Sequence, residues 1–146
     1  MIKNKKAYYE YFIEDEIIAG IQLVGSEIKS IRKGKASLSE SFCAFTGKEL
    51  FLVNCHIEEY EFANQFNHDP KRLKKLLITK KELKKLKSKI TEKGLTIIPL
   101  NMFINDNGLC KVTICVAKGK KLYDKRNSIA EREEKIKIKR NFNINI

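Results

Sequence analysis

The chain has 146 residues, the length of one domain, and it carries 30 lysine and arginine residues against 18 aspartate and glutamate residues. The positive excess is concentrated in residues 71–93, with 11 basic and 2 acidic side chains, and in residues 117–146, with 10 and 4. Such localised charge indicates a polyanionic partner, and nucleic acid is the leading candidate. A membrane partner is disfavoured, because no apolar run is long enough to span a bilayer and no secretory signal follows the basic N-terminus.

Cysteine usage and the lack of catalytic motifs narrow the class of protein further. Cys43, Cys55, Cys110 and Cys115 lie in strand-like apolar runs without a Cys-x-x-Cys spacing, so we expect buried, reduced thiols in a cytoplasmic protein. The sequence has no Gly-rich phosphate loop, no nucleophile elbow and no zinc-like pattern of Cys and His. We therefore expect a protein that is not an enzyme and that needs neither a metal nor a cofactor.

The first 24 residues predict two antiparallel strands, over residues 7–13 and residues 17–24. The three acidic residues between them, Glu14, Asp15 and Glu16, indicate a turn. A metal site at these carboxylates is the less favoured alternative, because no further ligand pattern accompanies them.

A short helix is predicted next, with Ser26 as its N-cap and Gly34 at its end. Helical spacing turns Ile28 and Ile31 toward the core. The exposed face of this helix would then carry the charged side chains Glu27, Lys29, Arg32 and Lys33.

A hairpin is predicted from the apolar residues 42–45 and 50–53, which flank a four-residue turn containing Gly47. His56 follows in another extended piece, and we expect it to be a packed or hydrogen-bonded strand residue rather than a catalytic base. His68 lies in a polar loop. We expect its side chain to be solvated there, with contact to RNA as the alternative.

A second helix is predicted from the capping box of Thr79 and Glu82, and it should end at Gly94. Three apolar residues at helical spacing form its buried face: Leu83, Leu86 and Ile90. The opposite face is lysine: Lys80, Lys81, Lys84, Lys85, Lys87 and Lys89. Because the charge of this segment exceeds what solubility requires, a phosphate-contact role is favoured over a merely solvated face.

Two long strands, over residues 95–104 and 109–117, complete the predicted body, and a strong turn at residues 105–108 joins them. Pro99 implies an edge or a bulge in the first of them. Six to eight short strands with two to three helices indicate a mainly β protein, a closed or partly closed β-barrel of the OB type. We expect this RNA-binding body to occupy residues 1–122.

The segment Lys-Gly-Lys-Lys-Leu-Tyr-Asp-Lys-Arg at residues 118–126 forms the junction between this body and a basic tail over residues 123–146. Its cations and its tyrosine suit phosphate contact combined with base stacking, and a solvated end of a basic protein is an equal alternative for this segment alone. A further capping box, at Ser128 and Glu131, begins a short helical pattern with few apolar side chains to bury. We therefore expect a flexible tail, disordered when free and helical when it meets its partner.

A series of motifs runs along the chain in one order and without large gaps. The segments are Asn-Lys-Lys-Ala at residues 4–7, Ala-Gly-Ile at 19–21, Gly-Ser-Glu-Ile-Lys-Ser at 25–30, Pro-Lys-Arg-Leu-Lys-Lys-Leu-Leu at 70–77, Ala-Lys-Gly-Lys-Lys at 117–121 and Asp-Lys-Arg at 124–126. Together they resemble the SsrA-binding protein family, also called small protein B. No single segment is decisive, but the series is specific.

The resemblance implies an OB-type barrel that binds transfer-messenger RNA (tmRNA, or SsrA RNA) at its tRNA-like domain. The family delivers this RNA to the A site of stalled ribosomes for trans-translation, and the protein stands in for the anticodon arm of a tRNA. The expected partners are therefore the RNA and the ribosome, mainly the decoding site and message channel of the small subunit. Elongation factor Tu and alanyl-tRNA synthetase would be indirect partners through the RNA, and a monomer in the cytoplasm is expected.

The resemblance also assigns functional residues. Contacts to the RNA would come from Asn4, Lys6, Glu27, Lys29, Lys74, Lys75, Leu77, Lys118, Lys120 and Lys121. Action at the decoding centre would come from Tyr123, Asp124, Lys125, Arg126, Arg132 and Lys135. Glu27 is the exception among the first group, because a carboxylate repels phosphate. It would accept from a base edge, orient a neighbouring lysine, or form a purely structural ion pair with Lys29 or Arg32.

Two residues depart from the family pattern. Tyr123 stands where the family often has His, which retains stacking but not a role that needs an imidazole. Thr79 stands where many members have Asn, which retains the helix cap but loses the amide. Two other functions compete with the resemblance: a general OB-fold RNA-binding or ribosome accessory protein, and an RNA-modifying enzyme that uses Glu27 or Lys29.

Overall fold

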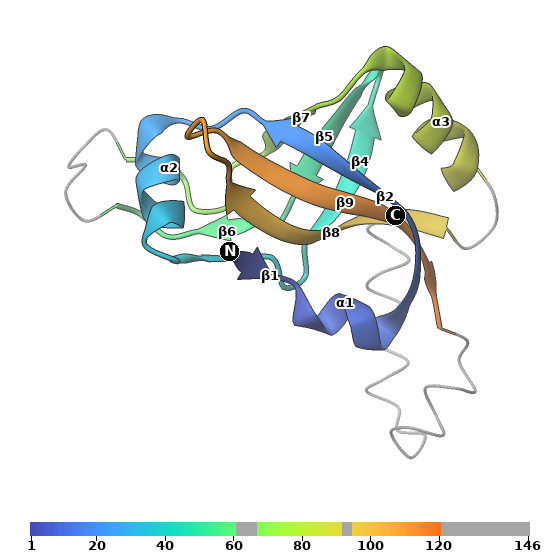
Figure 1. The fold of residues 1–146 in the computed structure, drawn as a ribbon, viewed down its shortest axis with the longest axis horizontal. Helices are drawn as coiled ribbons and strands as arrows, with labels where there is room; N and C mark the ends of the chain where they lie inside the picture. Colours follow the sequence, from blue (N-terminus) through green and yellow to red (C-terminus); the bar gives the residue numbers. More distant parts are fainter. Residues whose placement is uncertain (61–66, 92–94, 121–146) are drawn as a thin grey trace.

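The computed structural model describes residues 1–60, 67–91 and 95–120. Over these residues, seven strands form an antiparallel sheet in the order β1-β8-β4-β5-β7-β2-β9, and a further pairing of β8 with β9 curls it into a nearly closed barrel (Figure 1). The strands of this sheet are β1 (Ile2–Lys3), β2 (Tyr11–Ile21), β4 (Phe42–Thr46), β5 (Glu49–Val53), β7 (Lys74–Leu77), β8 (Leu95–Ile104) and β9 (Cys110–Gly119). The mainly β, partly closed barrel predicted from the sequence is confirmed.

The remaining described elements lie around this barrel. They are α1 (Lys5–Glu10), α2 (Gly25–Arg32), α3 (Lys80–Ile90) and a small separate pair of strands, β3 (Ala36–Ser37) and β6 (His56–Ile57). Figure 1 places α2 and α3 at opposite ends of the barrel, with α1 beneath its lower side. No helix in the described part of the chain is long and apolar enough to cross a membrane.

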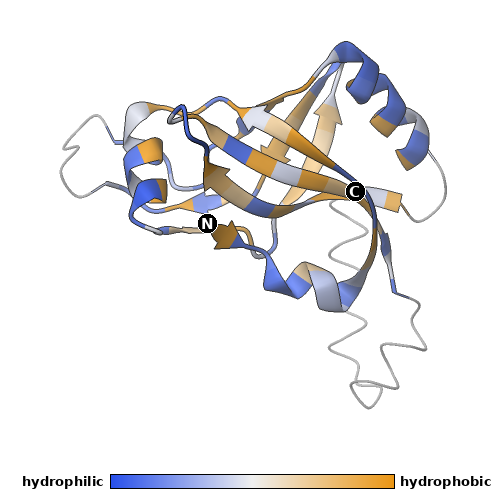
Figure 2. Cartoon of the chain, in the orientation of Figure 1, coloured by the Kyte–Doolittle hydropathy of each residue, from blue (hydrophilic) through white to orange (hydrophobic). Residues whose placement is uncertain are grey.

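The core is built mainly from the three longest strands, β2, β8 and β9. Their residues are paired in register, for example Ile17 with Ile114 and Ile97 with Val116. Val112, Ile114 and Val116 alternate along β9 and are completely buried in the main hydrophobic cluster. Figure 2 shows the hydrophobic residues concentrated on the strands, while α3 is mostly hydrophilic.

The prediction of a strand over residues 7–13 was wrong, because residues 5–10 form α1 and only the residues from Tyr11 onward are extended. The reason lies in tertiary packing. Ala7 is 2% exposed and packs on Cys115 and Ala117 of β9 together with Ile98 of β8. A helix presents this one small side chain to the outer surface of the strands, which overrides the strand propensity of the aromatic residues around it.

The predicted acidic turn was also wrong, because β2 continues through residues 14–16 as one strand with a bulge between Glu14 and Ile17. Asp15 takes up the irregular backbone with φ of 46°, and its carboxylate forms an ion pair with Lys89 of α3. Bulges absorb one extra residue without ending a strand. Within the described ranges, no group of three or more His, Cys, Asp or Glu side chains is placed to hold a metal ion.

Several local predictions are confirmed. β4 and β5 form the expected hairpin, and Gly47 has the positive φ of 64° that its turn requires. Thr79 caps α3, since its Oγ1 accepts from the amide of Glu82. The register of β8 against β9 shifts just after Pro99, as a bulge requires. All four cysteines are buried free thiols, and burial raises the pKa of Cys55 to about 11.

α2 begins earlier in the sequence than predicted, and this shift changes which of its side chains are buried. The helix begins at Gly25 with Val24 as its N-cap residue, so Ser26 lies inside the first turn instead of capping it. Ile31 faces the core as expected, and Gly34 follows the helix with φ of 74°. Glu27, predicted to be on the exposed face, is completely buried.

We predict that Ile114→Ala lowers the free energy of unfolding by about 3 kcal/mol, because it leaves a cavity in a completely buried part of the core. Ile18→Ala on the neighbouring strand β2 is the control. The Ile18 side chain is 61% exposed, so its truncation should cost roughly 0.5 kcal/mol or less. Urea unfolding followed by circular dichroism measures both, and equal losses would contradict the assigned core.

Candidate nucleic-acid interface

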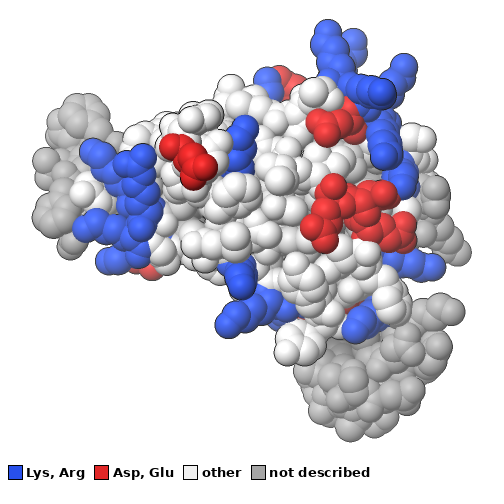
Figure 3. All heavy atoms as spheres, viewed as in Figure 1, with Lys and Arg blue, Asp and Glu red and all other residues white. Residues whose placement is uncertain are grey.

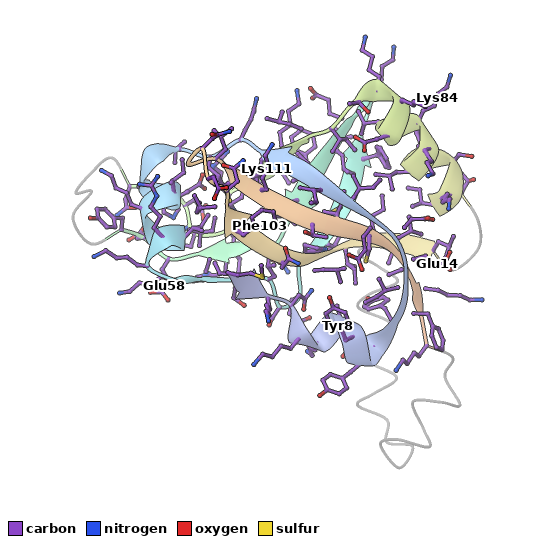
Figure 4. The ribbon with its side chains drawn as sticks, in the orientation of Figure 1. Tyr8, Glu14, Glu58, Lys84, Phe103 and Lys111 are labelled. Atoms are coloured by element: carbon purple, nitrogen blue, oxygen red, sulfur yellow. The ribbon has the colours of Figure 1, made fainter. Side chains whose placement is uncertain are left out.

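The positive charge of the described surface is gathered in separate places. Figure 3 shows lysine and arginine side chains over α2 and over α3, with acidic side chains beside α3 over β2. On α2 the exposed cations are Lys29 and Arg32, and on α3 they include Lys80, Lys81, Lys84, Lys85 and Lys87. Figure 4 shows Lys84 on α3 and Tyr8 on α1 at different sides of the barrel. The molecule therefore presents more than one surface that can meet phosphates.

A cation and aromatic pair marks the α2 surface. The ammonium groups of Lys29 and Lys33 lie 5.5 Å and 5.6 Å from the centre of the Tyr60 ring. At these distances the cations are attracted to the face of the ring. Lys29 is exposed, as an RNA-contacting lysine should be.

Glu27 is the buried anchor of this end of the barrel. Its two carboxylate oxygens accept from Arg72, at 3.0 Å from Nε and 2.7 Å from Nη2, and Oε1 also accepts from the amide of Val24 at 2.9 Å. Of the three roles considered for Glu27, a structural ion pair is the one in the structure, but its partner is Arg72 and not Lys29 or Arg32. The bidentate pair joins residues 45 positions apart in the sequence.

The environment of Glu27 holds its carboxylate in the charged form. Burial alone would raise the pKa of this carboxyl, but the hydrogen bonds from Arg72 and Val24, with attraction to Arg72 and Lys74, lower the pKa below its ordinary value. Because the folded-state pKa lies below that of the unfolded chain, the pair stabilises the fold above the ordinary glutamate pKa. This contribution is lost as the pH falls through the lower value.

Lys74 is also buried, although the resemblance assigns it to RNA contact. Its side chain is 0% exposed, and Nζ donates to the carbonyl oxygens of Arg72 at 2.6 Å and Cys55 at 3.1 Å. Burial lowers its pKa below that of an ordinary lysine. Lys74 therefore fixes the chain that enters β7 and is not placed to touch a phosphate.

His68 was predicted to be solvated, and this was wrong. The side chain is 6% exposed, with Nε2 2.8 Å from the carbonyl oxygen of Ile57 and Nδ1 2.8 Å from Oγ of Ser26. A carbonyl only accepts, so Nε2 carries the proton toward Ile57. In the neutral ring, Nδ1 then accepts from the hydroxyl of Ser26. The residue joins the loop before β7 to the first turn of α2.

Lys75 and Leu77 lie on β7, closer to the surface. Lys75 is half-buried and forms an ion pair with Glu49 of the neighbouring strand. Leu77 is 44% exposed. Both side chains can reach a partner that lies against this part of the barrel, in contrast to the buried Lys74 at the start of the same strand.

A second group of the predicted residues lies near α1. Asn4 is 6% exposed, and its amide donates to the carbonyl oxygen of Pro99 at 2.8 Å, so it attaches the N-terminal segment to β8. Lys6 is exposed and pairs with Glu40 at 2.6 Å. Lys118 is exposed at the end of β9, and the ammonium of Lys120 lies 5.7 Å from the ring of Phe12.

Sequence reasoning missed the exposed aromatic side chains beside these lysines. Tyr8, Tyr9 and Phe12 are 56%, 77% and 51% exposed. The strand predicted over residues 7–13 gave no indication of this arrangement. A helix that buries Ala7 instead places Tyr8 and Tyr9 on the outside. Exposed rings beside cations are the usual means of stacking on bases and holding phosphates.

The other predicted residues lie outside the described part of the chain. They are Lys121, Tyr123, Asp124, Lys125, Arg126, Arg132 and Lys135.

The nearly closed barrel, its separated basic surfaces and its exposed aromatic residues define a small β-barrel of the nucleic-acid-binding class. The chain belongs to the SmpB family, because the model of that family, described as SmpB protein, matches residues 1–144. The resemblance to the SsrA-binding proteins is thereby confirmed.

Individual relatives agree with this assignment. SsrA-binding protein of Christiangramia forsetii is 55% identical over 139 residues, which are 95% of this chain and 88% of that protein. SsrA-binding protein of Rickettsia canadensis is 55% identical over 131 residues, 90% of this chain and 86% of that protein. A chain of the solved structure "tmRNA-SmpB: a journey to the center of the bacterial ribosome" has a TM-score of 0.71 at 43% identity, over 86% of this chain and 87% of that one.

We predict that Glu27→Gln lowers the free energy of unfolding at neutral pH by about 2 kcal/mol. The loss is smaller than for an ion pair with both side chains buried, because the Arg72 side chain is 35% exposed to solvent. The difference from the parent should shrink as the pH falls from the ordinary glutamate pKa through the lower folded-state value, since the unfolded parent chain takes up its proton first and the folded carboxylate is protonated last. Urea unfolding at several pH values measures it. Glu40→Gln, which breaks the exposed pair with Lys6, is the control and should change stability little at any pH.

Proposed function

We propose that the chain binds SsrA RNA, the transfer-messenger RNA, at its tRNA-like domain and delivers it to the A site of ribosomes stalled on truncated messages. In this role it rescues the ribosome by trans-translation and takes the place of the anticodon arm of a tRNA. The observation that carries the proposal is family membership over nearly the whole chain, combined with cationic surfaces at separate places on one barrel, over α2 and over α3. A protein that joins an RNA to a ribosome needs at least two such surfaces.

The side chains that meet the RNA in this proposal are the exposed ones among those assigned by resemblance. At the α2 end these are Lys29, Lys75 and Leu77, and near α1 they are Lys6, Lys118 and Lys120. A folded RNA is recognised through its shape, phosphates, riboses and unstacked bases, so cations with a few apolar contacts suit it. Asn4, Glu27 and Lys74 act through the fold by positioning their neighbours.

The α1 surface fits an additional stacking role in this function. Tyr8, Tyr9 and Phe12 expose their rings, and the ammonium of Lys120 lies against Phe12. Stacking on aromatic side chains is tolerant of base identity, because every base has a flat face. We assign this surface to bases of RNA exposed on the ribosome or on the SsrA RNA.

The chain beyond residue 122 completes the proposal. Its basic tail would act at the decoding centre and in the vacant message channel, through Tyr123, Asp124, Lys125, Arg126, Arg132 and Lys135. Elongation factor Tu and alanyl-tRNA synthetase would meet this protein indirectly, as partners of the same RNA. This work takes place in the cytoplasm, with the protein acting as a monomer.

The test of this function compares two RNAs and two lengths of chain. Binding is measured to folded SsrA RNA and to an unstructured single-stranded RNA of equal length, with the full chain and with a version ending after Lys121. We expect the folded RNA to bind more tightly, and truncation to spare most of that binding while abolishing peptide tagging on stalled ribosomes. Equal binding to both RNAs would contradict the proposal and favour a general RNA-binding barrel.

A second prediction separates contact residues from positioning residues. Lys29→Gln should weaken binding to SsrA RNA and reduce the slope of log affinity against log salt by about one, because one phosphate contact is lost. Lys74→Gln should leave that slope unchanged and lower the stability of the fold, since the buried ammonium donates only to backbone carbonyls. Filter binding over a salt series and urea unfolding measure the two effects. A changed slope for Lys74→Gln would show that the buried lysine reaches the RNA.

A further inference from the structure

The helix α3, at the end of the barrel opposite α2, is the most highly charged of the described helices. Six of its 11 residues are lysines and one, Glu82, is acidic. Four of the lysines are exposed and form no ion pair within the described part of the chain: Lys80, Lys81, Lys84 and Lys85. Figure 3 shows lysine side chains standing out from the surface over α3. We call these four residues the outer lysines of α3.

The lysines of α3 are spaced so that they repel one another along the helix. Side chains three or four residues apart lie on the same face of a helix, and like charges in these positions destabilise it. Five pairs of lysines have this spacing: 80 with 84, 81 with 84, 81 with 85, 84 with 87 and 85 with 89. Lys80 and Lys81 also lie in the first turn, where the helix dipole disfavours cations. Because a helix of this length is marginal by itself, its charge works against its formation.

The apolar contact between α3 and the barrel depends mainly on one side chain. Leu86 is 1% exposed and belongs to the main hydrophobic cluster. Leu83 and Ile90, one turn before and after it, are only partly buried against that cluster. Few buried apolar contacts are typical of an element that separates from its protein at a low cost in free energy. The strands beneath α3 differ in this respect, since Val112, Ile114 and the residues that follow in β9 are completely buried.

The polar contacts of α3 do not neutralise its outer lysines. Lys89 pairs with Asp15 of β2, but their side chains are 34% and 31% exposed, and solvent weakens such a pair. The carboxylate of Glu82 serves the helix cap, where Oε1 accepts from Oγ1 of Thr79 at 3.1 Å. α2 is attached quite differently, through the completely buried carboxylate of Glu27. Among these two helices, α3 is therefore the one that opens more easily.

The outer lysines suit a partner that carries a row of phosphates. α3 has no aromatic side chain and no arginine, so it offers neither a ring for stacking nor a planar fork for a base edge. Its ammonium groups are point charges that attract phosphates in any sequence. From Lys80 to Lys87 the helix rises roughly 10 Å, a length over which a nucleic-acid duplex carries about six phosphates. Closely spaced phosphates can thus meet several of these lysines at once.

We propose that α3 is a lid on this end of the barrel, and that a polyanion of closely spaced phosphates controls its closure. In the free protein the lysines repel one another, and the helix separates from the barrel readily. Phosphates bound along the outer lysines remove this repulsion, and a ligand that binds only the closed form stabilises it. Leu86 is then held in the core. The inference goes beyond the proposed function, because any partner with such phosphates closes the lid.

Hydrogen exchange of the full chain, measured residue by residue by NMR at constant ionic strength, tests this lid. In the free chain, the amides of residues 84–90 should be at least about tenfold less protected than those of Val112 and Ile114 in β9. Inorganic polyphosphate, or a short RNA duplex, should raise the protection of α3 about tenfold. Single inorganic phosphate and polyglutamate at the same concentration of charge should not. Equal protection by polyglutamate would overturn the assignment to phosphate and indicate an acidic protein as the partner.

A double variant, Lys81→Gln with Lys84→Gln, separates the lid from a merely solvated lysine surface. It leaves helix propensity nearly unchanged, because Lys and Gln have similar propensities, and of the five close pairs it keeps only that of Lys85 with Lys89. The free variant should protect its α3 amides about fivefold better than the parent, and polyphosphate should then add less than about threefold. The matched control is Lys3→Gln with Lys35→Gln, which removes the same charge from exposed positions outside α3. It should behave like the parent.

Two outcomes overturn the lid. One is protection of α3 in the free parent equal to that of β9, since the helix then does not open separately. The other is an equal response of the parent and the double variant to polyphosphate. Neither measurement needs SsrA RNA, so a failure of the proposed function in its own binding test leaves this result standing, and the reverse also holds.

Discussion

The α2 end of this barrel depends on one ion pair, between the buried Glu27 in the first turn of α2 and Arg72 before β7. A completely buried carboxylate is stable only when its charge is compensated, and here two side-chain bonds and one amide supply the compensation. Because the two residues come from distant parts of the chain, the pair cannot form until α2 and the segment before β7 have met. His68 and Lys74 then fix that segment at two further points. The segment between these points is thereby held in place, and the carbonyl oxygen of Pro70 also accepts from the amide of Ile57.

The side of the barrel that α1 covers is organised by a different constraint. β8 and β9 are buried on both faces where α1 covers them, and Ala7 is the small side chain that allows the helix to lie close to Cys115 and Ala117. A larger residue there would push α1 away from the strands. The same packing leaves the aromatic residues next to Ala7 on the outside. The helix therefore protects the strands and presents Tyr8 and Tyr9 to solvent at once.

The regular parts of the fold could be predicted from the sequence because their signals are local. The capping box at Thr79, the turn at Gly47 and the alternation along β9 each depend on neighbouring residues. α1 and the bulge at Asp15 could not be predicted, since both are imposed by partners far away in the chain, β9 for the helix and Lys89 for the bulge. In the candidate site the same limit applies. The motifs identified Glu27, Lys29 and Lys74 as important but carried no information about which of them is buried, because burial is set by the path of the segment before β7.

The distribution of charged side chains over the surface limits where a polyanion can bind, and the net charge of +12 does not show this. Acidic side chains of β2, Glu14 among them, lie beside the lysine-rich helix α3 on the face shown in Figures 3 and 4. One of the lysines of α3, Lys89, forms an ion pair with Asp15 of β2. A polyanion that follows the cations of α3 is repelled where it meets these carboxylates. The surface at α2 and the surface at α3 are consequently better suited to two separate stretches of RNA than to one continuous strand. Carboxylates beside the lysines of α3, which repel phosphate, thus favour an adaptor over a protein that wraps a single RNA.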